Sequence, residues 1–99
     1  MVNQGEIYNH LVAGARYRVV VVSSDAHNAT GRPAWIAPVR HGGIDAPPYL
    51  VVLADTDPLG GAVDIDRMIR AVPAGEAIGL LTGATVERVR QAINTLFAG

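Results

Sequence analysis

The sequence contains no cysteine and no lysine. Because cysteine is absent, disulfide bonds, thiolate metal sites and cysteine nucleophiles are excluded. All eight basic residues are arginine, which fits a GC-rich coding sequence and indicates phosphate binding only weakly. The formal net charge is -1, so no overall positive field attracts nucleic acid, and any such contact requires a local basic patch.

The chain also lacks a long apolar run and the common catalytic motifs. No stretch approaches the roughly 20 apolar residues of a membrane span, and the N-terminus shows no signal segment, so we expect a cytoplasmic protein. With 99 residues, 49% hydrophobic and 17% charged, the sequence predicts one compact domain over residues 1–99. Phosphate-binding loops, dinucleotide-binding glycine motifs, zincin motifs and hydrolase nucleophile elbows are absent from the sequence.

A valine-rich segment is the part of the chain around which the rest is predicted to fold. Four consecutive valines at residues 19–22 favour a strand buried on both faces, at the centre of a sheet. Arg16 and Arg18 precede them. The alternation of a strand places these two arginines on one face and Tyr17 on the other.

The other elements are predicted from periodicity and turn residues. A strand over residues 5–12 and the strand over 16–24 form a hairpin around Gly14. Thr82 caps a helix that runs to about Phe97. Further strands are predicted at residues 34–39, 49–54, 62–72 (one bent strand) and 77–81. Loops or turns are predicted at residues 25–33, 40–43, 44–48 and 55–61.

Charged side chains stand at the ends of neighbouring predicted strands: Arg16, Arg18, Arg40 and His41. Cleavage of RNA through its own 2′-hydroxyl needs a group that takes the hydroxyl proton, a group that protonates the leaving oxygen, and cations that stabilise the phosphorane. Arginines and a histidine can meet these needs without a metal. The alternative is that these residues are ordinary solvated charges at strand ends.

The case for a metal is weaker. His10, His27 and His41 are widely spaced, so a zinc site would need carboxylates supplied by the fold. The aspartates at residues 55 and 57 resemble a calcium loop but lack its later glycine-to-glutamate pattern. We therefore expect no metal and no cofactor.

Several short motifs occur in a characteristic order: Gly5-Glu6-Ile7-Tyr8, the valine strand with Ser23-Ser24-Asp25 and Asn28, Ile36-Ala37-Pro38-Val39, Met68 to Val72, and Ile78 to Thr82 before the final helix. This order resembles MazF/PemK toxins of bacterial type II toxin–antitoxin systems, in the superfamily that contains CcdB. The resemblance implies a mainly β fold with a C-terminal helix, in which a small curved antiparallel sheet forms an SH3-like barrel. It also implies a homodimer that is neutralised by a disordered antitoxin segment.

MazF-like enzymes share an Arg-Pro dipeptide that enters the second strand, and a Thr or Ser just after the Ala-Pro strand. Here Tyr17 and Arg18 stand at the dipeptide, and Arg40 stands at the hydroxyl position. The arginine is displaced by one residue, which places it on the opposite strand face unless a bulge re-aims it.

Other segments are similar to the CcdB gyrase poisons, namely Arg16-Tyr17-Arg18, the Thr30-Gly31-Arg32 loop and residues 91–97. They imply DNA gyrase as an alternative target, without catalysis. However, Ala98-Gly99 stands where those proteins end in Trp-Gly-Ile. A third alternative is a degenerate homologue that only binds an antitoxin or nucleic acid.

The resemblance implies a metal-independent endoribonuclease that cleaves single-stranded RNA to inhibit growth. The expected partners are a second copy of the chain and a cognate antitoxin peptide. The expected catalytic residues are Arg16, Arg18 and His41. The expected RNA contacts are Tyr17, Ser23, Asn28 and Arg40. The expected partner contacts are Arg90, Asn94 and Phe97.

Overall fold

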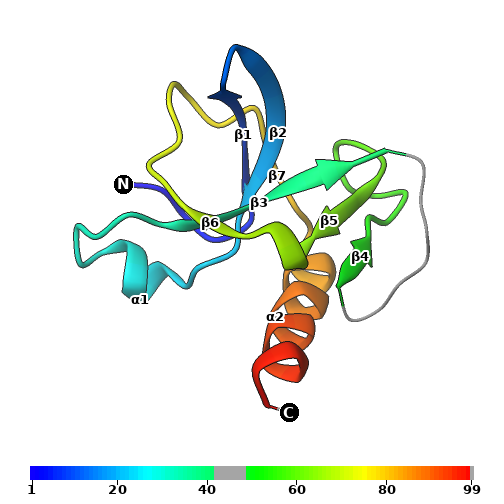
Figure 1. Ribbon diagram of the computed structural model, residues 1–99. Coiled ribbons are helices and arrows are strands. Elements are labelled where there is room, and N and C mark those ends of the chain that lie inside the picture. Colours follow the sequence, from blue (N-terminus) through cyan, green and yellow to red (C-terminus); the bar gives the residue numbers. More distant parts are fainter. Residues whose placement is uncertain (42–48, 99) are drawn as a thin grey trace.

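The computed structural model describes residues 1–41 and 49–98. The predicted connector at 44–48 and the glycines at 42 and 43 lie outside the described residues. The described part of the chain forms a seven-stranded sheet in the order β4-β5-β3-β2-β1-β7, with β6 paired to β3 (Figure 1). Its strands are β1 (Glu6–Val12), β2 (Ala15–Val21), β3 (Trp35–Arg40), β4 (Leu50–Val52), β5 (Ala62–Asp64), β6 (Ile69–Arg70) and β7 (Gly79–Leu80). Its helices are α1 (Asp25–Asn28), the 3-10 helix η1 (Ile65–Arg67) and α2 (Gly83–Ala98).

The valine-rich strand β2 lies inside the sheet between β1 and β3, and all of its pairings are antiparallel. Val20 and Val22 belong to one buried cluster, which includes Val89 of α2. Val19 and Val21 belong to a second cluster on the other face. The prediction of a strand buried on both faces is therefore confirmed, because successive side chains of a strand point to opposite sides.

The sheet curls into a half-barrel, and α2 packs against one of its faces (Figure 1). The expected class, mainly β with a C-terminal helix, is thus confirmed. Thr82 caps α2 as predicted, since its Oγ1 accepts a hydrogen bond from the backbone N of Thr85 at 3.4 Å. No helix among the described residues is both long enough and apolar enough to cross a membrane.

Two predictions of secondary structure are wrong. Residues 25–33 are not all loop, because Ser24 caps α1 by accepting a hydrogen bond from the backbone N of His27 at 3.2 Å. Residues 62–72 are not one bent strand. β5 and β6 both pair with β3, but their registers differ, and the three residues of η1 supply the extra length between them.

The β1–β2 hairpin turns through Ala13 and Gly14, between the paired residues Val12 and Ala15. Both turn residues have positive φ angles, 49° and 83° respectively. This is the signature of a two-residue type I′ turn, whose twist matches that of the strands. The pairing then continues without a bulge from Val12↔Ala15 to Ile7↔Val20, so the turn sets the register of the whole hairpin.

The start of α2 is tied to the preceding loop by the buried carboxylate of Asp57. This carboxylate accepts hydrogen bonds from the backbone N of Ala54 at 2.7 Å, the backbone N of Thr82 at 2.8 Å and the Oγ1 of Thr85 at 2.6 Å. Burial raises the pKa of Asp57, but the hydrogen bonds outweigh it and hold the pKa below its ordinary value. Asp57 therefore has a structural role in joining this loop to the helix.

Candidate functional site

A hollow of about 710 Å³ lies beside the β1–β2 hairpin and the end of β3. β2 and β3 pair only over residues 19–21 and 36–38, and beyond this point the hairpin and β3 diverge (Figure 1). We call this space the hairpin hollow. Its polar lining residues are His10, Tyr17, Arg40, His41 and Arg67, and its apolar lining residues are Val19, Ile36, Pro38, Val39, Met68 and Ile69.

Three adjacent strands contribute polar side chains to the hairpin hollow. On β1, His10 pairs directly with Tyr17 of β2. On β2, Tyr17 is two residues from Val19 and shares its face, and Val19 pairs with Pro38 of β3. Arg40 is two residues beyond Pro38. The alternation of the strands therefore brings an imidazole, a phenol and a guanidinium to one face of the sheet.

Arg40 is held in place by a buried acid. Its Nη1 lies 3.4 Å from the Oδ2 of Asp64, whose side chain is only 4% exposed, whereas the side chain of Arg40 is 53% exposed. The Nε of Arg67 lies 3.8 Å from the same oxygen. One carboxylate thus positions two arginines at the rim of the hollow and leaves both guanidinium groups accessible to a ligand.

The backbone of Arg40 is also closely approached by Gly61. A Cβ atom added to Gly61 would lie 2.5 Å from the carbonyl oxygen of Arg40, and the φ angle of Gly61 is 113°. Only glycine fits this conformation without strain. Gly61 therefore allows β5 to pack against the end of β3 where Arg40 is presented.

Arg16 and Arg18 do not line the hairpin hollow. Arg16 pairs with Leu11, and Arg18 pairs with Asn9, within the continuous register of the hairpin. Both arginines are exposed and lie on the strand face opposite to that of Tyr17. The structure therefore brings Tyr17, Arg40 and His41 together and leaves the other two predicted catalytic residues outside.

Ser23 and Asn28 lie away from this hollow and are hydrogen-bonded to each other. The Oγ of Ser23 donates to the Oδ1 of Asn28 at 2.5 Å, and the Nδ2 of Asn28 donates to the backbone O of Ser23 at 3.1 Å. Ser23 Oγ also accepts from the backbone N of Trp35 at 3.0 Å. Both residues are buried, and in this structure they join the end of β2 to α1 and β3.

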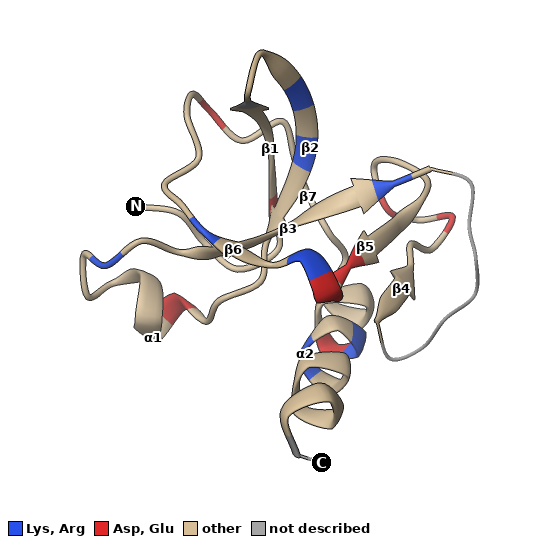
Figure 2. Ribbon diagram, in the orientation of Figure 1, with Lys and Arg blue, Asp and Glu red and all other residues tan. Residues whose placement is uncertain are grey.

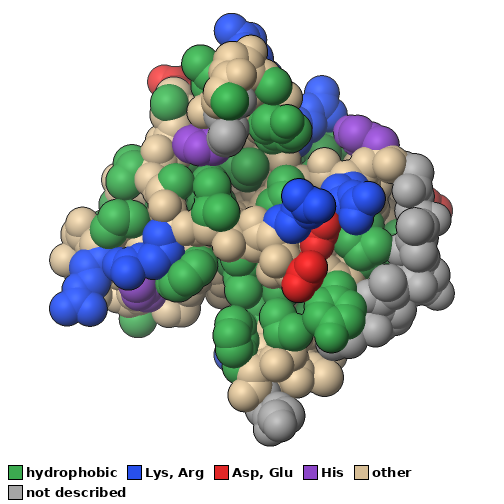
Figure 3. All heavy atoms as spheres, in the orientation of Figure 1, with side chains coloured by type: hydrophobic (Ala, Val, Ile, Leu, Met, Phe, Trp, Pro, Cys, Tyr) green, Lys and Arg blue, Asp and Glu red, His purple; other side chains and the backbone are tan. Residues whose placement is uncertain are grey.

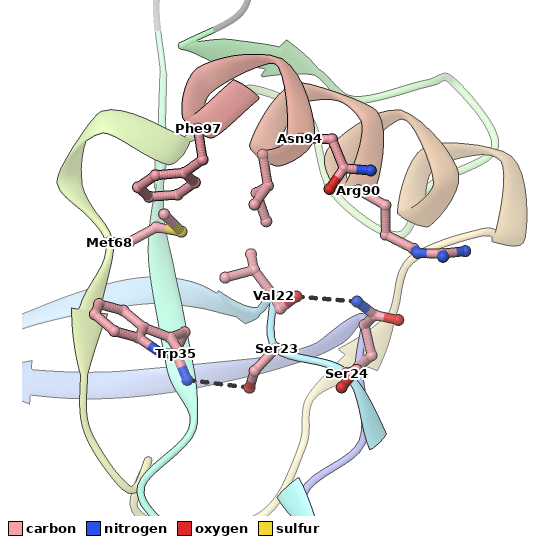
Figure 4. A pocket seen from close by; sticks show the side chains of 10 residues that line it. Val22, Ser23, Ser24, Trp35, Met68, Arg90, Asn94 and Phe97 are labelled. Atoms are coloured by element: carbon pink, nitrogen blue, oxygen red, sulfur yellow. Dashed lines mark hydrogen bonds between the residues drawn. The ribbon is translucent and has the colours of Figure 1, made fainter. Parts of the chain in front are cut away.

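A second hollow, of about 450 Å³, lies between α2 and the sheet. We call it the helix hollow. Figure 4 shows Trp35, Met68 and Phe97 at one end, with Asn94 and Arg90 along the helix. Arg90 is partly neutralised by Glu87, since its Nη1 lies 2.9 Å from Glu87 Oε2. The three predicted partner-binding residues, Arg90, Asn94 and Phe97, therefore line one cavity.

Charge is concentrated near the hairpin hollow. Figure 2 shows basic residues on β2, at the end of β3 and on η1, next to acidic residues where β5 meets η1. Figure 3 shows arginine and histidine side chains around apolar surface on the same face. Among residues 1–41 and 49–98, no three His, Asp or Glu side chains come close enough to hold a metal ion.

Sequence reasoning missed three residues of this region, His10, Asp64 and Arg67. The sequence held a signal for His10, because a two-residue turn at Ala13 and Gly14 implies that residue 10 pairs with residue 17. It held none for Asp64 or Arg67, because residues 62–72 were expected to form a continuous strand.

No family model matches the sequence, and no curated protein matches it by sequence. Solved structures, in contrast, match almost the whole chain. An endoribonuclease from mycobacterial species, solved in complex with its cognate antitoxin, matches with a TM-score of 0.84 and 21% identity over 99% of this chain and 96% of that chain. Another structure of an endoribonuclease from mycobacterial species matches with a TM-score of 0.85 and 21% identity over 98% of this chain and 91% of that chain. A MazE-MazF complex from Deinococcus radiodurans matches with a TM-score of 0.79 and 19% identity over 96% of this chain and 93% of that chain.

The fold and the two hollows define a small antiparallel half-barrel with a C-terminal helix packed on it. This architecture is the MazF fold, and the resemblance to MazF-like toxins is confirmed at the level of the fold. These neighbours give no support to the CcdB-like alternative with DNA gyrase as target.

Proposed function

We propose that the protein is an endoribonuclease toxin that cleaves single-stranded RNA at the hairpin hollow, without a metal, in the cytoplasm. The observation that carries this proposal is the convergence of Tyr17, Arg40 and His41 on one hollow at the diverging ends of β2 and β3. The fold shared with endoribonucleases from mycobacterial species supports the same activity.

The lining of the hollow matches the chemical needs of RNA cleavage. Arg40 binds the scissile phosphate and stabilises the charge of the phosphorane, because its guanidinium is half-exposed and fixed by Asp64. Arg67 supplies a second cation from η1. His41 transfers a proton, and the exposed ring of Tyr17 stacks on a base. An unstacked base fits the apolar wall of the hollow, which favours single strands over a duplex.

Arg16 and Arg18 have a different place in this proposal. They lie on the outer face of the hairpin, so we assign them to phosphates that flank the scissile one, where cations raise affinity without specifying sequence. Their catalytic role stays a prediction, as does contact of RNA with Ser23 and Asn28.

We further propose two partners, a second copy of the chain and an antitoxin peptide. Several large apolar side chains on β1, on β7 and in the segment before β7 are exposed to solvent, and a second copy of the chain could bury them: Leu11, Val72, Ile78 and Leu80. The helix hollow suits an antitoxin segment with a large apolar side chain, which would enter between Trp35, Met68 and Phe97. One MazF neighbour was solved with MazE, which supports an antitoxin partner.

The activity is tested by incubating the purified protein with a long single-stranded RNA in EDTA. We expect discrete fragments that end in a 2′,3′-cyclic phosphate. Arg40→Ala should lower the cleavage rate by about 100-fold or more, because a preorganised cation at the phosphorane is lost. Arg32→Ala removes an exposed arginine outside the hairpin hollow and is the matched control.

Tyr17→Phe and Tyr17→Ala separate stacking from the hydroxyl. Stacking alone predicts that Phe retains cleavage and Ala weakens RNA binding. Intact RNA with the unmodified protein would overturn the endoribonuclease proposal and favour a protein that only binds its partners. Cleavage that requires an added metal would overturn the metal-independent mechanism.

A further inference from the structure

His10 is a titratable residue in the hairpin hollow to which no role has yet been given. It lines the hollow from β1, directly across the hairpin from Tyr17. Its Nδ1 atom is buried and has no hydrogen-bond partner among the described residues. Leaving a buried polar atom without a hydrogen bond destabilises a fold, so the presence of such an atom in a site calls for an explanation.

The position of His10 complements that of His41. Neighbouring strands are about 4.8 Å apart, so β1 and β3 are separated by about 10 Å where both pair with β2, at residues 19–20. At His10 and His41, beyond this pairing, the hairpin and β3 diverge and open the hollow (Figure 1). His10 reaches the hollow from β1 and His41 from the position just after the end of β3, while Tyr17 lies on β2 between these two strands. A phosphate bound above Tyr17 would therefore lie between the two imidazoles, with Arg40 and Arg67 at the rim of the hollow.

The reaction requires two proton transfers, and His41 alone accounts for one of them. The first imidazole takes the proton of the 2′-hydroxyl as the O2′–P bond forms, and the second, protonated imidazole gives a proton to O5′ as the P–O5′ bond breaks. The products are a 2′,3′-cyclic phosphate and a 5′-hydroxyl, and no further reactant is consumed.

We propose that His10 is the second catalytic residue for proton transfer in this site and works in a pair with His41. The proposal rests on the endoribonuclease function proposed above. Besides the two histidines, the groups that line the hollow and carry charge or titrate are Tyr17 from β2, Arg40 from β3 and Arg67 from η1. Histidine is the side-chain type that most often exchanges protons near neutral pH, so a catalytic pair of histidines predicts a bell-shaped pH profile.

The experiment compares the unmodified protein, His10→Gln and the control His27→Gln, whose side chain lies in α1 outside the hollow. Three quantities are measured: kcat from pH 5 to 9, the affinity for a non-cleavable 2′-O-methyl RNA, and the melting temperature. His10→Gln should lower kcat by about 100-fold or more, leave the affinity within twofold, and remove one limb of the bell-shaped pH profile. His27→Gln should match the unmodified protein.

A second substrate identifies which transfer His10 performs. When the leaving oxygen O5′ is replaced by sulfur, departure needs no proton, so His10→Gln regains activity if His10 protonates the leaving group. If His10 instead takes the 2′-hydroxyl proton, the sulfur substrate gives no rescue. Either result, together with the lost limb, supports the proposal.

The proposal is overturned if His10→Gln keeps both limbs of the pH profile, whatever its rate, or if it loses affinity while kcat stays unchanged. In these cases the unmodified protein still cleaves RNA, so the proposed function survives. If the unmodified protein leaves RNA intact, both the function and the role of His10 are refuted together.

Discussion

The buried carboxylate of Asp64 lies 3.4 Å from the guanidinium of Arg40 and determines where that cation is presented. The arrangement is asymmetric, because Asp64 is enclosed while Arg40 reaches into the hairpin hollow. In the proposed endoribonuclease, Asp64 is therefore a positioning residue that orients Arg40.

Asp64→Asn should release Arg40 from this fixed orientation. We expect the RNA cleavage rate to fall about tenfold, because a displaced cation no longer matches the phosphorane. The free energy of unfolding should fall by only about 1 kcal/mol, since the partner arginines are largely exposed and can be solvated. Cleavage assays and urea unfolding measure the two effects. Asp66→Asn, at an exposed neighbouring site, should change neither; equal rates for both variants would refute the positioning role.

Gly61→Ala should disturb the same region through the backbone. The added Cβ would collide with the carbonyl oxygen of Arg40, and the φ angle of 113° disfavours any residue but glycine. We expect a loss of about 2 kcal/mol in the free energy of unfolding, measured in urea. Gly60→Ala is the control, because a Cβ there meets nothing within 4 Å. Similar stabilities of the two variants would contradict this account of Gly61.

Ala13→Gly should stabilise the protein. Ala13 has a φ angle of 49° in the hairpin turn, and the left-handed conformation costs an L-residue about 1 kcal/mol relative to glycine. Thermal unfolding should therefore shift upward. Ala15→Gly, at a strand position, should lower the melting temperature, because glycine weakens a strand. An increase at both positions would show that turn strain is not the cause.

Asp57 should give the stability a specific pH dependence. Its folded pKa is lowered, so the charged carboxylate stabilises the native state above the ordinary value of 3.8. This contribution is present at neutral pH and is lost as the pH falls from about 4 through the lowered folded pKa. Urea unfolding of Asp57→Asn should show lower stability at pH 7 and a flatter acid limb. Asp55→Asn, at an exposed position, should follow the unmodified protein.

Trp35 is the single tryptophan of the sequence and lines the helix hollow, so it can report on occupancy. Its side chain is partly exposed, and the guanidinium of Arg70 lies 5.8 Å from the ring centroid. Binding of the proposed antitoxin peptide should shift the emission of Trp35 to shorter wavelength as water is excluded. Phe97→Ala should weaken binding about tenfold. Thr95→Ala is the control, because Thr95 does not line the hollow. An unchanged spectrum at saturation would place the antitoxin elsewhere.

Much of the fold could be predicted from local patterns. The valine run, the hairpin around Gly14 and the capped helix after Thr82 each carry a signal within a few neighbouring residues. The break between β5 and β6 could not be predicted in this way. It arises because both strands pair with β3 in different registers, and such long-range pairing leaves no periodic trace in residues 62–72.

Only part of the site could be predicted, because some of its contacts join residues that are far apart in sequence. The structure brings Tyr17, Arg40 and His41 together, as strand alternation allows once β2 and β3 are neighbours. The role of Asp64 depends on its contact with Arg40, which is far away in sequence, and no sequence motif predicts this contact. The opposite placement of Arg18 and Tyr17 follows from alternation, and the absence of a bulge became clear only from the pairing of β1 with β2.

Because both faces of β2 are packed at its valines, a change in the length of the strand before Val19 would alter which side chains face the hairpin hollow. Because odd-numbered and even-numbered valines enter separate clusters, the core keeps the strand from slipping. The residues of β2 before Val19 lie outside both clusters and are held by their pairing with β1. One residue inserted between Arg18 and Val19, accommodated as a bulge against β1, would turn Arg18 towards the hollow and Tyr17 away from it. The length of a short exposed segment therefore decides which functional group faces the hollow.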